Sequence, residues 1–252
     1  MTKYKIALVC ITLNPPYWEF IKPMIESARK HLLANHEVDY ILWSDMPTDL
    51  IPDVKVIPTE PVEWPMPTLM RYHLFLQQEE LLRNYDYIFY CDADMIYVDT
   101  VGDEILGEGI TAVAHPMYWF RKGLKFPLKP NPLSQAYIHV PEHYYAGGFQ
   151  GGKTELFISA MKEMKKMIDK DFTINYIPIW NDESVWNKYI FNHPEIPLIF
   201  LDPSYVYPDS LIKEYYEKIW GRSFSPKLVT ITKKFTTSKE AGTIIREQLS
   251  NF

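Results

Sequence analysis

Short runs of β-branched and aromatic residues alternate with amphipathic stretches along most of this chain, a pattern typical of an α/β domain. In the first amphipathic stretch, apolar residues recur at helical spacing, so the predicted helix should pack one face on a sheet. The expected strands span 5–13, 38–44, 54–58, 85–91, 110–114, 197–201 and 228–232. The expected helices span 17–33, 68–84, 154–169 and 182–191.

The composition excludes several classes of protein. Of the 252 residues, 47% are hydrophobic and 23% are charged, which permits a core and excludes disordered, collagen-like and coiled-coil chains. The formal net charge of −6 argues against a broad binding surface for nucleic acid. We expect one domain over 1–252, with a long surface loop at 117–132 and a mobile tail at 233–252.

Neither a targeting segment nor a transmembrane segment is expected. The apolar run at the N-terminus is short and no cleavage site follows it, so it predicts a buried strand. No other run approaches the roughly 18 apolar residues of a membrane span. We therefore expect a soluble, cytoplasmic protein. Cys10 and Cys91 lie inside apolar runs and are expected to be reduced thiols in the core.

The segment 85–99 places two carboxylates directly after a buried strand. Asp92 and Asp94 flank one small residue at the strand's carboxyl end, where ligands bind in open α/β sheets. Such a pair could hold a hard divalent cation that bridges the diphosphate of a nucleotide. The alternative is that one aspartate caps a turn and the other is solvated.

Four of the ten glycines fall within the segment YYAGGFQGG, residues 144–152. Glycine lets the backbone approach a ligand closely, although this spacing is not that of a known phosphate-binding loop. The alternative is a tight strand-to-helix turn that serves packing alone.

Acidic residues also begin the predicted helix at 182–191. Asn181 or Asp182 could be its N-cap, and acidic side chains in a first turn complement the helix dipole. If Glu183 stays ionised at neutral pH there, it could stabilise or attack an electron-poor sugar carbon. The alternative is that these residues only cap the helix.

One histidine and three basic residues each have two possible interpretations. His115 follows a predicted strand, and Arg71 precedes the strand that ends in Asp92. Lys233 and Lys234 begin the predicted tail and could close over phosphates. Each could equally be an ordinary surface or core residue.

Together these motifs resemble the family-six glycosyltransferases, the group of the histo-blood group A and B transferases and α-1,3-galactosyltransferase. The resemblance covers about residues 6–234 and rests on the order and spacing of five motifs: CDADM at 91–95, HP at 115–116, SQAYI at 134–138, YYAGGFQGG at 144–152 and W-x-DES-x-x-NKY at 180–189. It implies a GT-A fold, which is a Rossmann-like mixed sheet flanked by helices. It also implies a UDP-sugar donor, Mn²⁺, and α-1,3 transfer of galactose or N-acetylgalactosamine with retention.

The resemblance assigns roles to individual positions. Asp92 and Asp94 match the metal-binding aspartates, and Glu183 matches the glutamate on the far side of the anomeric carbon. The other donor-side positions are Tyr17 at uracil, Arg71, Asp92 near the ribose, Asp182 at the donor sugar, and Lys233 and Lys234 at the diphosphate. His115 and Trp180 match acceptor-site positions.

Ala146, Gly147 and Gly148 match the positions that select the donor. Glycine at the third position leaves room for an N-acetyl group, so the resemblance implies UDP-N-acetylgalactosamine, with UDP-galactose as the alternative because one methyl discriminates only modestly. Two residues depart from the family pattern, since Asn181 replaces a usual His and Gln150 replaces a more apolar residue.

The resemblance therefore implies a metal-dependent hexosyltransferase with a galactose-containing acceptor, and fucosylated galactosides are common acceptors in the family. The chain lacks the anchor and stem of vertebrate relatives, which suggests a microbial or viral source. Two other classes stay open: a nucleotidyltransferase or phosphohydrolase that uses the same carboxylates, and a glycan-binding module without catalysis.

Overall fold

A computed structural model describes residues 2–118, 131–139, 143–209, 213–220 and 223–231. Most of the predicted loop at 117–132 and the whole predicted tail at 233–252, with Lys233 and Lys234, lie outside these residues.

A seven-stranded mixed sheet forms the centre of the protein, with the strand order β3-β2-β1-β4-β7-β6-β8. β7 is antiparallel to both of its neighbours, and the other pairs are parallel. The strands are β1 (Lys5–Thr12), β2 (Glu37–Ser44), β3 (Val54–Pro58), β4 (Tyr87–Cys91), β6 (Ile110–Ala114), β7 (Tyr145–Lys153) and β8 (Leu198–Leu201). A smaller sheet joins β5 (Met95–Tyr97), β10 (Leu228–Thr230) and β9 (Tyr207–Pro208).

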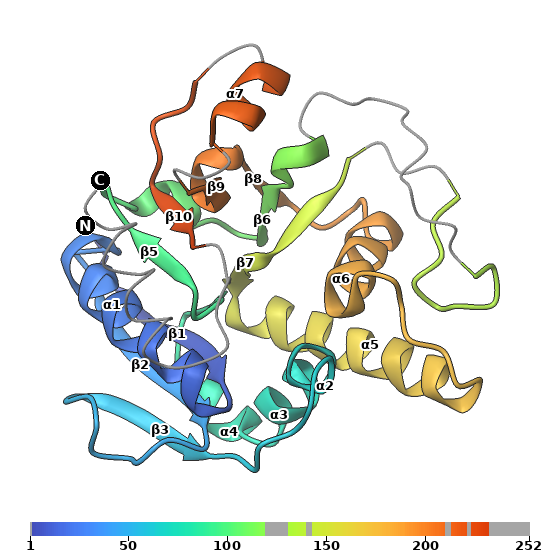
Figure 1. The fold of residues 1–252 in the computed structure, drawn as a ribbon, viewed down its shortest axis with the longest axis horizontal. Helices are drawn as coiled ribbons and strands as arrows, with labels where there is room; N and C mark the ends of the chain where they lie inside the picture. Colours follow the sequence, from blue (N-terminus) through green and yellow to red (C-terminus); the bar gives the residue numbers. More distant parts are fainter. Residues whose placement is uncertain (1, 119–130, 140–142, 210–212, 221–222, 232–252) are drawn as a thin grey trace.

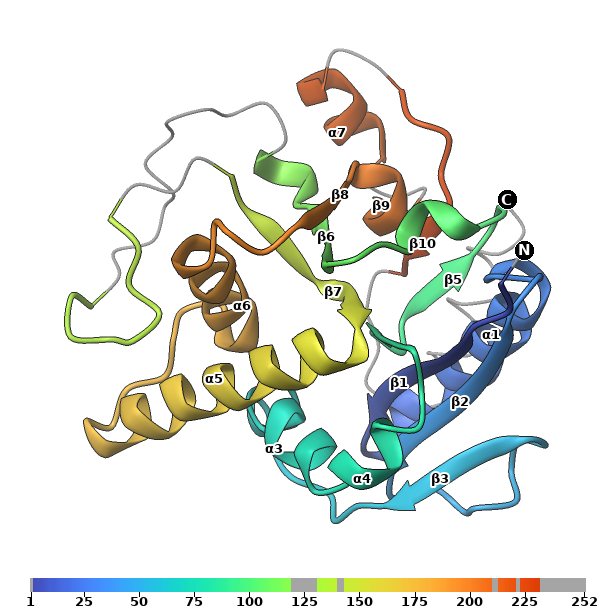
Figure 2. The same cartoon turned by 180° about the vertical axis from the view of Figure 1, so that it is seen from behind.

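Helices cover both faces of the large sheet (Figures 1 and 2). α1 (Pro15–His31) packs on one face, where it shares a core with Ile6, Leu8 and Cys10 of β1. The alternate residues of β1 face a second core, formed with α3 (Arg71–Leu76), α5 (Thr154–Thr173) and α6 (Asn181–Asn192). A parallel strand buried on both faces has to be apolar throughout, which explains the continuous apolar run of β1. The predicted α/β class and flanked mixed sheet are confirmed.

Most predicted elements form within a few residues of their expected bounds. α1 begins two residues early because Pro15 and Pro16 fit a first turn, where the missing N–H groups cost nothing. The helix predicted at 68–84 is instead three short helices, α2 (Met66–Leu69), α3 and α4 (Glu79–Leu82). The backbone leaves the helical conformation at Met70 and at Gln78. Tertiary packing therefore overrides the local helical pattern.

The glycine-rich segment is a strand, so its interpretation as a strand-to-helix turn is wrong. β7 lies between β4 and β6, which supply its backbone hydrogen-bond partners. A Cβ at Gly151 would lie 2.3 Å from the Ile88 carbonyl oxygen, and Gly152 has φ +139°. Two of the four glycines are therefore required by close strand packing and backbone conformation.

The remaining described elements are short. α7 (Lys213–Trp220) follows β9, and 3-10 turns span Asp103–Ile105, Pro116–Tyr118 and Pro203–Val206. Cys10 and Cys91 are buried free thiols that form no disulfide, as predicted. Among the described residues, every helix is too short or too polar to cross a bilayer.

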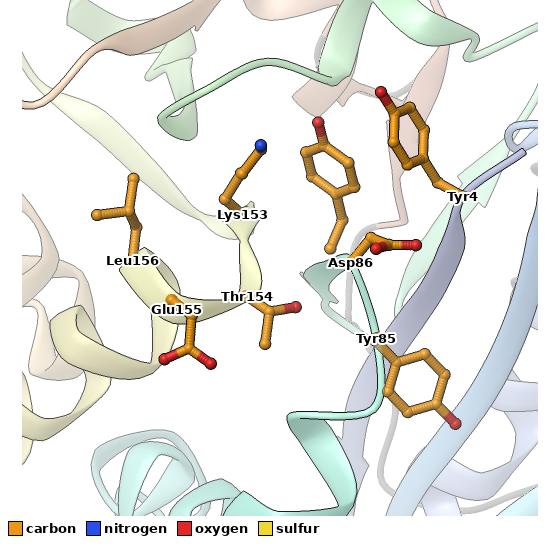
Figure 3. Close-up of a pocket in the computed structure, with 8 residues that line it drawn as sticks. Tyr4, Tyr85, Asp86, Lys153, Thr154, Glu155 and Leu156 are labelled. Carbon is orange, nitrogen blue, oxygen red and sulfur yellow. The ribbon is translucent and has the colours of Figure 1, made fainter. Parts of the chain in front are cut away.

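A cavity of about 280 Å³ opens where β4 begins and β7 runs into α5 (Figure 3). Tyr4, Tyr87 and Thr154 are among its lining residues. It lies by the amino ends of β1 and β4, whereas the predicted site residues Asp92 and Asp94 follow the carboxyl end of β4.

Candidate active site

The carboxyl ends of β1 and β4 border a pocket that collects four of the residues predicted to bind the donor or its metal ion. Tyr17, Arg71, Asp92 and Asp94 all line it. Tyr17 comes from the start of α1 and Arg71 from the start of α3, while both aspartates follow β4 directly. Ligands of open α/β sheets bind at this edge, so the strand-end position predicted for Asp92 and Asp94 is confirmed.

Arg71 connects three parts of this site, although its side chain is only 3% exposed. Its guanidinium lies 3.1 Å from Asp182 Oδ2 and 3.5 Å from Asp92 Oδ1, and it donates a 3.2 Å hydrogen bond to the Gly147 carbonyl. It also lies 3.9 Å from the centre of the Tyr90 ring. Burial opposes its charge, but Asp182, Tyr90 and Asp92 raise the Arg71 pKa. The cation is therefore permanently charged and holds its partners in place.

Glu183 lies in the first turn of α6, beside β7. Its Oε2 accepts a 2.8 Å hydrogen bond from the Gly147 backbone N–H, and the Tyr144 hydroxyl also favours the ionised carboxylate. Burial raises the Glu183 pKa to about 7, and these two interactions only partly oppose the shift. With a pKa near 7, Glu183 is only partly ionised at neutral pH in the ligand-free site, because desolvation outweighs the helix dipole.

The predicted capping role of Asn181 or Asp182 is also wrong. The N-cap position is Trp180, whose backbone N–H donates a 3.1 Å hydrogen bond to Ser184 Oγ. Asp182 is 4% exposed and pairs with Arg71. Burial raises the Asp182 pKa to about 6, with Arg71 opposing the shift.

Gly147 and Gly148 form an irregular segment of β7 between the carboxylates of two different elements. The pairing of β6 with β7 shifts there, from Ala112 beside Gln150 to Val113 beside Ala146. A Cβ at Gly147 would lie 3.2 Å from Glu183 Cβ, and a Cβ at Gly148 would lie 3.1 Å from Asp92 Oδ2. The two glycines thus allow Glu183 and Asp92 to approach one backbone segment.

The two predicted acceptor residues belong to different elements, since His115 follows β6 and Trp180 precedes α6. The His115 ring packs edge-on against Tyr144, with ring centroids 5.7 Å apart. Burial lowers the His115 pKa to about 4, and its Nδ1 accepts the Met117 N–H. The neutral ring therefore carries its proton on Nε2. Trp180 is 47% exposed at the start of α6, and Ala146 is buried in the core.

The sequence model of glycosyltransferase family 6 matches residues 2–220 of this chain. The chain belongs to glycosyltransferase family 6. The predicted family is confirmed, and the mixed sheet flanked by helices agrees with the GT-A fold expected from it.

Curated relatives of this family-6 member come from vertebrates and bacteria. It is 30% identical over 209 residues to histo-blood group ABO system transferase 1 of Rattus norvegicus, covering 78% of this chain and 59% of the relative. It is 28% identical over 206 residues to globoside alpha-1,3-N-acetylgalactosaminyltransferase 1 of Gallus gallus, covering 77% and 59%. It is 29% identical over 161 residues to O-antigen biosynthesis glycosyltransferase WbnI of Escherichia coli, covering 62% and 67%. The chain thus spans about three-fifths of the length of the two vertebrate relatives.

The family-6 chain offers oxygen ligands that fit a divalent cation. Asp92 Oδ1 contacts Arg71 and accepts the Tyr90 hydroxyl, while its side chain remains 32% exposed at the pocket. Asp94 lines the same pocket. No group of three or more acidic, histidine or cysteine side chains suited to a metal occurs among the described residues. A cation here would therefore need oxygens from its ligand as well as from the two aspartates, and carboxylates with phosphate oxygens suit Mn²⁺.

Sequence reasoning missed three polar residues that support this site. Tyr144 reaches Glu183, and the Gln150 amide contacts Gly147. Asn187 exchanges hydrogen bonds with the Tyr145 backbone at 2.7 and 2.8 Å, which fastens α6 to β7. The motifs at 144–152 and 180–189 contain all three, but only the fold shows which of them face the carboxylates.

Proposed function

We propose that this family-6 glycosyltransferase transfers N-acetylgalactosamine from UDP-N-acetylgalactosamine, in α-1,3 linkage and with retention, to a galactose-containing acceptor. The observation that carries the proposal is the placement of Glu183 and Asp92 on either side of the Gly147–Gly148 segment. UDP-galactose is the alternative donor. The name of the globoside relative, an alpha-1,3-N-acetylgalactosaminyltransferase, supports N-acetylgalactosamine over galactose as the transferred sugar.

The donor side of the proposal uses the pocket between β1 and β4. Tyr17 would pack on uracil, and Arg71 would hold Asp92 and Asp182 toward the ribose and the donor sugar. Asp92 and Asp94 would hold Mn²⁺, which would stabilise the charge on the departing diphosphate. Lys233 and Lys234 remain proposed diphosphate contacts. This pairing of local cations with the diphosphate is compatible with an acidic protein of net charge −6.

Glu183 is the proposed catalytic residue. Its ionised carboxylate would stabilise the electron-poor anomeric carbon as UDP departs. The hydrogen bond from the Gly147 N–H orients the carboxylate. Retention would follow from two successive displacements, in which Glu183 attacks the anomeric carbon as UDP leaves and the acceptor hydroxyl then displaces Glu183, or from same-face attack by the acceptor hydroxyl as UDP leaves.

The acceptor side would use His115 and Trp180. The His115 Nε2 proton can be donated to an acceptor hydroxyl, since Nδ1 is already engaged by Met117. The exposed ring of Trp180 offers an apolar face on which a pyranose can stack.

Gly148→Ala should weaken donor binding through Asp92. Its new Cβ would press on Asp92 Oδ2 at 3.1 Å and on Met95 Sδ at 3.3 Å, so the carboxylate has to move. We expect Kd for UDP with Mn²⁺ to rise about tenfold, equal to about 1.4 kcal/mol. Calorimetry measures this, with Gly102→Ala as the control because its methyl would meet only the Glu104 side chain. An unchanged Kd accompanied by a switch to UDP-galactose would show that position 148 acts on the sugar alone.

The rate should depend on the ionisation of Glu183. Burial raises its pKa to about 7, Asp182 and Asp92 add to the shift, and the Gly147 N–H and Tyr144 hydroxyl oppose it. Because the ionised form is the active one, kcat/KM should rise with pH and level off above about 7. Initial rates between pH 5.5 and 8.5 test this. A flat profile across that range contradicts the assigned ionisation.

A transfer assay tests the proposed function itself. The protein is incubated with Mn²⁺, labelled UDP-N-acetylgalactosamine or UDP-galactose, and galactosides with and without fucose. We expect acceptor-dependent product in α-1,3 linkage, with only slow donor hydrolysis when the acceptor is omitted. Rapid nucleotide turnover without acceptor would favour a nucleotidyltransferase or phosphohydrolase, and glycan binding without turnover would favour a binding module.

A further inference from the structure

Gln150 is a fully buried amide in the strand that carries the donor-selecting glycines. Its exposed fraction is 0%. Its Nε2 donates a 3.1 Å hydrogen bond to the Gly147 carbonyl, and its Oε1 accepts a 3.1 Å hydrogen bond from the Tyr72 hydroxyl. The resemblance to the family leads one to expect a more apolar residue at this position.

A buried amide costs free energy unless both of its ends are hydrogen-bonded. An apolar side chain of similar size would fill the same space without that cost. The two hydrogen bonds of Gln150 satisfy the amide, and one of them reaches the backbone beside the proposed catalytic residue. The contact with Gly147 therefore calls for an explanation beyond packing.

Gly147 needs an external restraint because glycine has more backbone freedom than any other residue. Its N–H faces Glu183 Oε2 at 2.8 Å, and its carbonyl belongs to the next peptide group. Gln150 holds that carbonyl from within the same strand, three residues away, and Arg71 holds it at 3.2 Å from α3. With both peptide groups fixed, the N–H keeps its direction toward Glu183.

We propose that Gln150 is a positioning residue that fixes Gly147, so that the Gly147 N–H orients Glu183 and the glycine segment keeps its shape toward the donor sugar. This inference rests on the proposed function, because it assigns Gln150 a part in the same transfer. It predicts an effect on turnover and on donor preference, which loss of packing alone would not produce.

Gln150→Met tests the proposal, with Tyr72→Phe as the matched control. Met retains the volume and removes both hydrogen bonds, whereas Phe at position 72 removes only the Tyr72 bond and leaves the contact with Gly147. We expect both variants to lower Tm. Only Gln150→Met should lower kcat, by about tenfold, and change the ratio of kcat/KM for the two UDP-sugars by at least about threefold. KM for the donor should change less than kcat.

The outcomes separate this proposal from the proposed function. If the wild-type chain transfers neither sugar, the proposed function fails. If it transfers sugar and Gln150→Met stays within about twofold of wild-type kcat with the same donor ratio, only the role of Gln150 is overturned. An equal loss in Tyr72→Phe also overturns it. Gln150→Leu is judged by the same readouts should Gln150→Met fail to fold.

Discussion

Glu183→Gln should lower kcat for sugar transfer by about 10²- to 10³-fold, the loss that follows removal of one group that stabilises transition-state charge. The amide has nearly the same shape, and its oxygen can still accept the hydrogen bond from the Gly147 N–H. The fold and the donor-binding pocket should therefore remain intact. Initial rates at saturating donor and acceptor measure the change, with KM for the donor changing little.

Glu155→Gln is the control for this experiment. Glu155 is also a glutamate in the first turn of a helix, but it is exposed at the start of α5, where it pairs with Arg83. Its replacement should leave kcat unchanged. Transfer by Glu183→Gln within about tenfold of wild type would mean that the Glu183 carboxylate does not act on the reacting sugar.

Arg71→Met should destabilise the fold by about 3–5 kcal/mol, because removing one partner of a buried ion pair leaves the other charge uncompensated. Arg71 and Asp182 are 3% and 5% exposed, and their charged atoms lie 3.1 Å apart. Thermal or denaturant unfolding measures the loss. Arg83→Met is the control, since Arg83 pairs with Glu79 and Glu155 at the surface and should affect unfolding far less.

The stability lost in Arg71→Met should depend on pH. Burial already raises the Asp182 pKa to about 6, and without Arg71 the pKa should rise further. A carboxyl whose pKa is higher in the folded state than in the unfolded state destabilises the fold when it is ionised. The stability lost in Arg71→Met should therefore be largest above the pKa that Asp182 has in the folded variant. It should shrink as the pH falls from that pKa to about 6, where Asp182 becomes protonated in the wild type as well, and change little below this. A deficit that is constant with pH would show that lost packing, not the charge of Asp182, causes the destabilisation.

The hydrophobic pattern of the sequence predicted most strands of the large sheet, because each of these buried strands is a short run of apolar residues. The apolar run of β1 was sufficient to predict that strand. The abrupt change from Cys91 to Asp92 was sufficient to predict the carboxyl end of β4. β7 was missed because four glycines carry no side-chain pattern. Its strand conformation comes from pairing with β4 and β6, which are distant in sequence.

The charged residues of the candidate site could be predicted from the sequence, whereas the residues whose roles depend on tertiary contacts could not. Asp92, Asp94 and Arg71 line one pocket, as expected from the position of the two aspartates at the end of a buried strand and from the family resemblance. Tyr144 and Gln150 are polar residues within aromatic and glycine-rich sequence, and their roles depend on contacts across strands and helices. The raised pKa of Glu183 was not predicted, because helix position alone does not report the burial that causes it.

Calorimetric titration with UDP tests the central claim most directly, which is that Asp92 and Asp94 bind the donor diphosphate through a cation. Titrations are run with and without Mn²⁺ for the wild-type chain, Asp92→Asn and Asp94→Asn, with the exposed Asp53→Asn as control. We expect Mn²⁺ to strengthen UDP binding at least about tenfold, or 1.4 kcal/mol, in the wild type and in Asp53→Asn. Either pocket variant should lose this gain. Equal UDP affinity with and without Mn²⁺ in the wild type, or an undiminished gain in both pocket variants, would contradict the account.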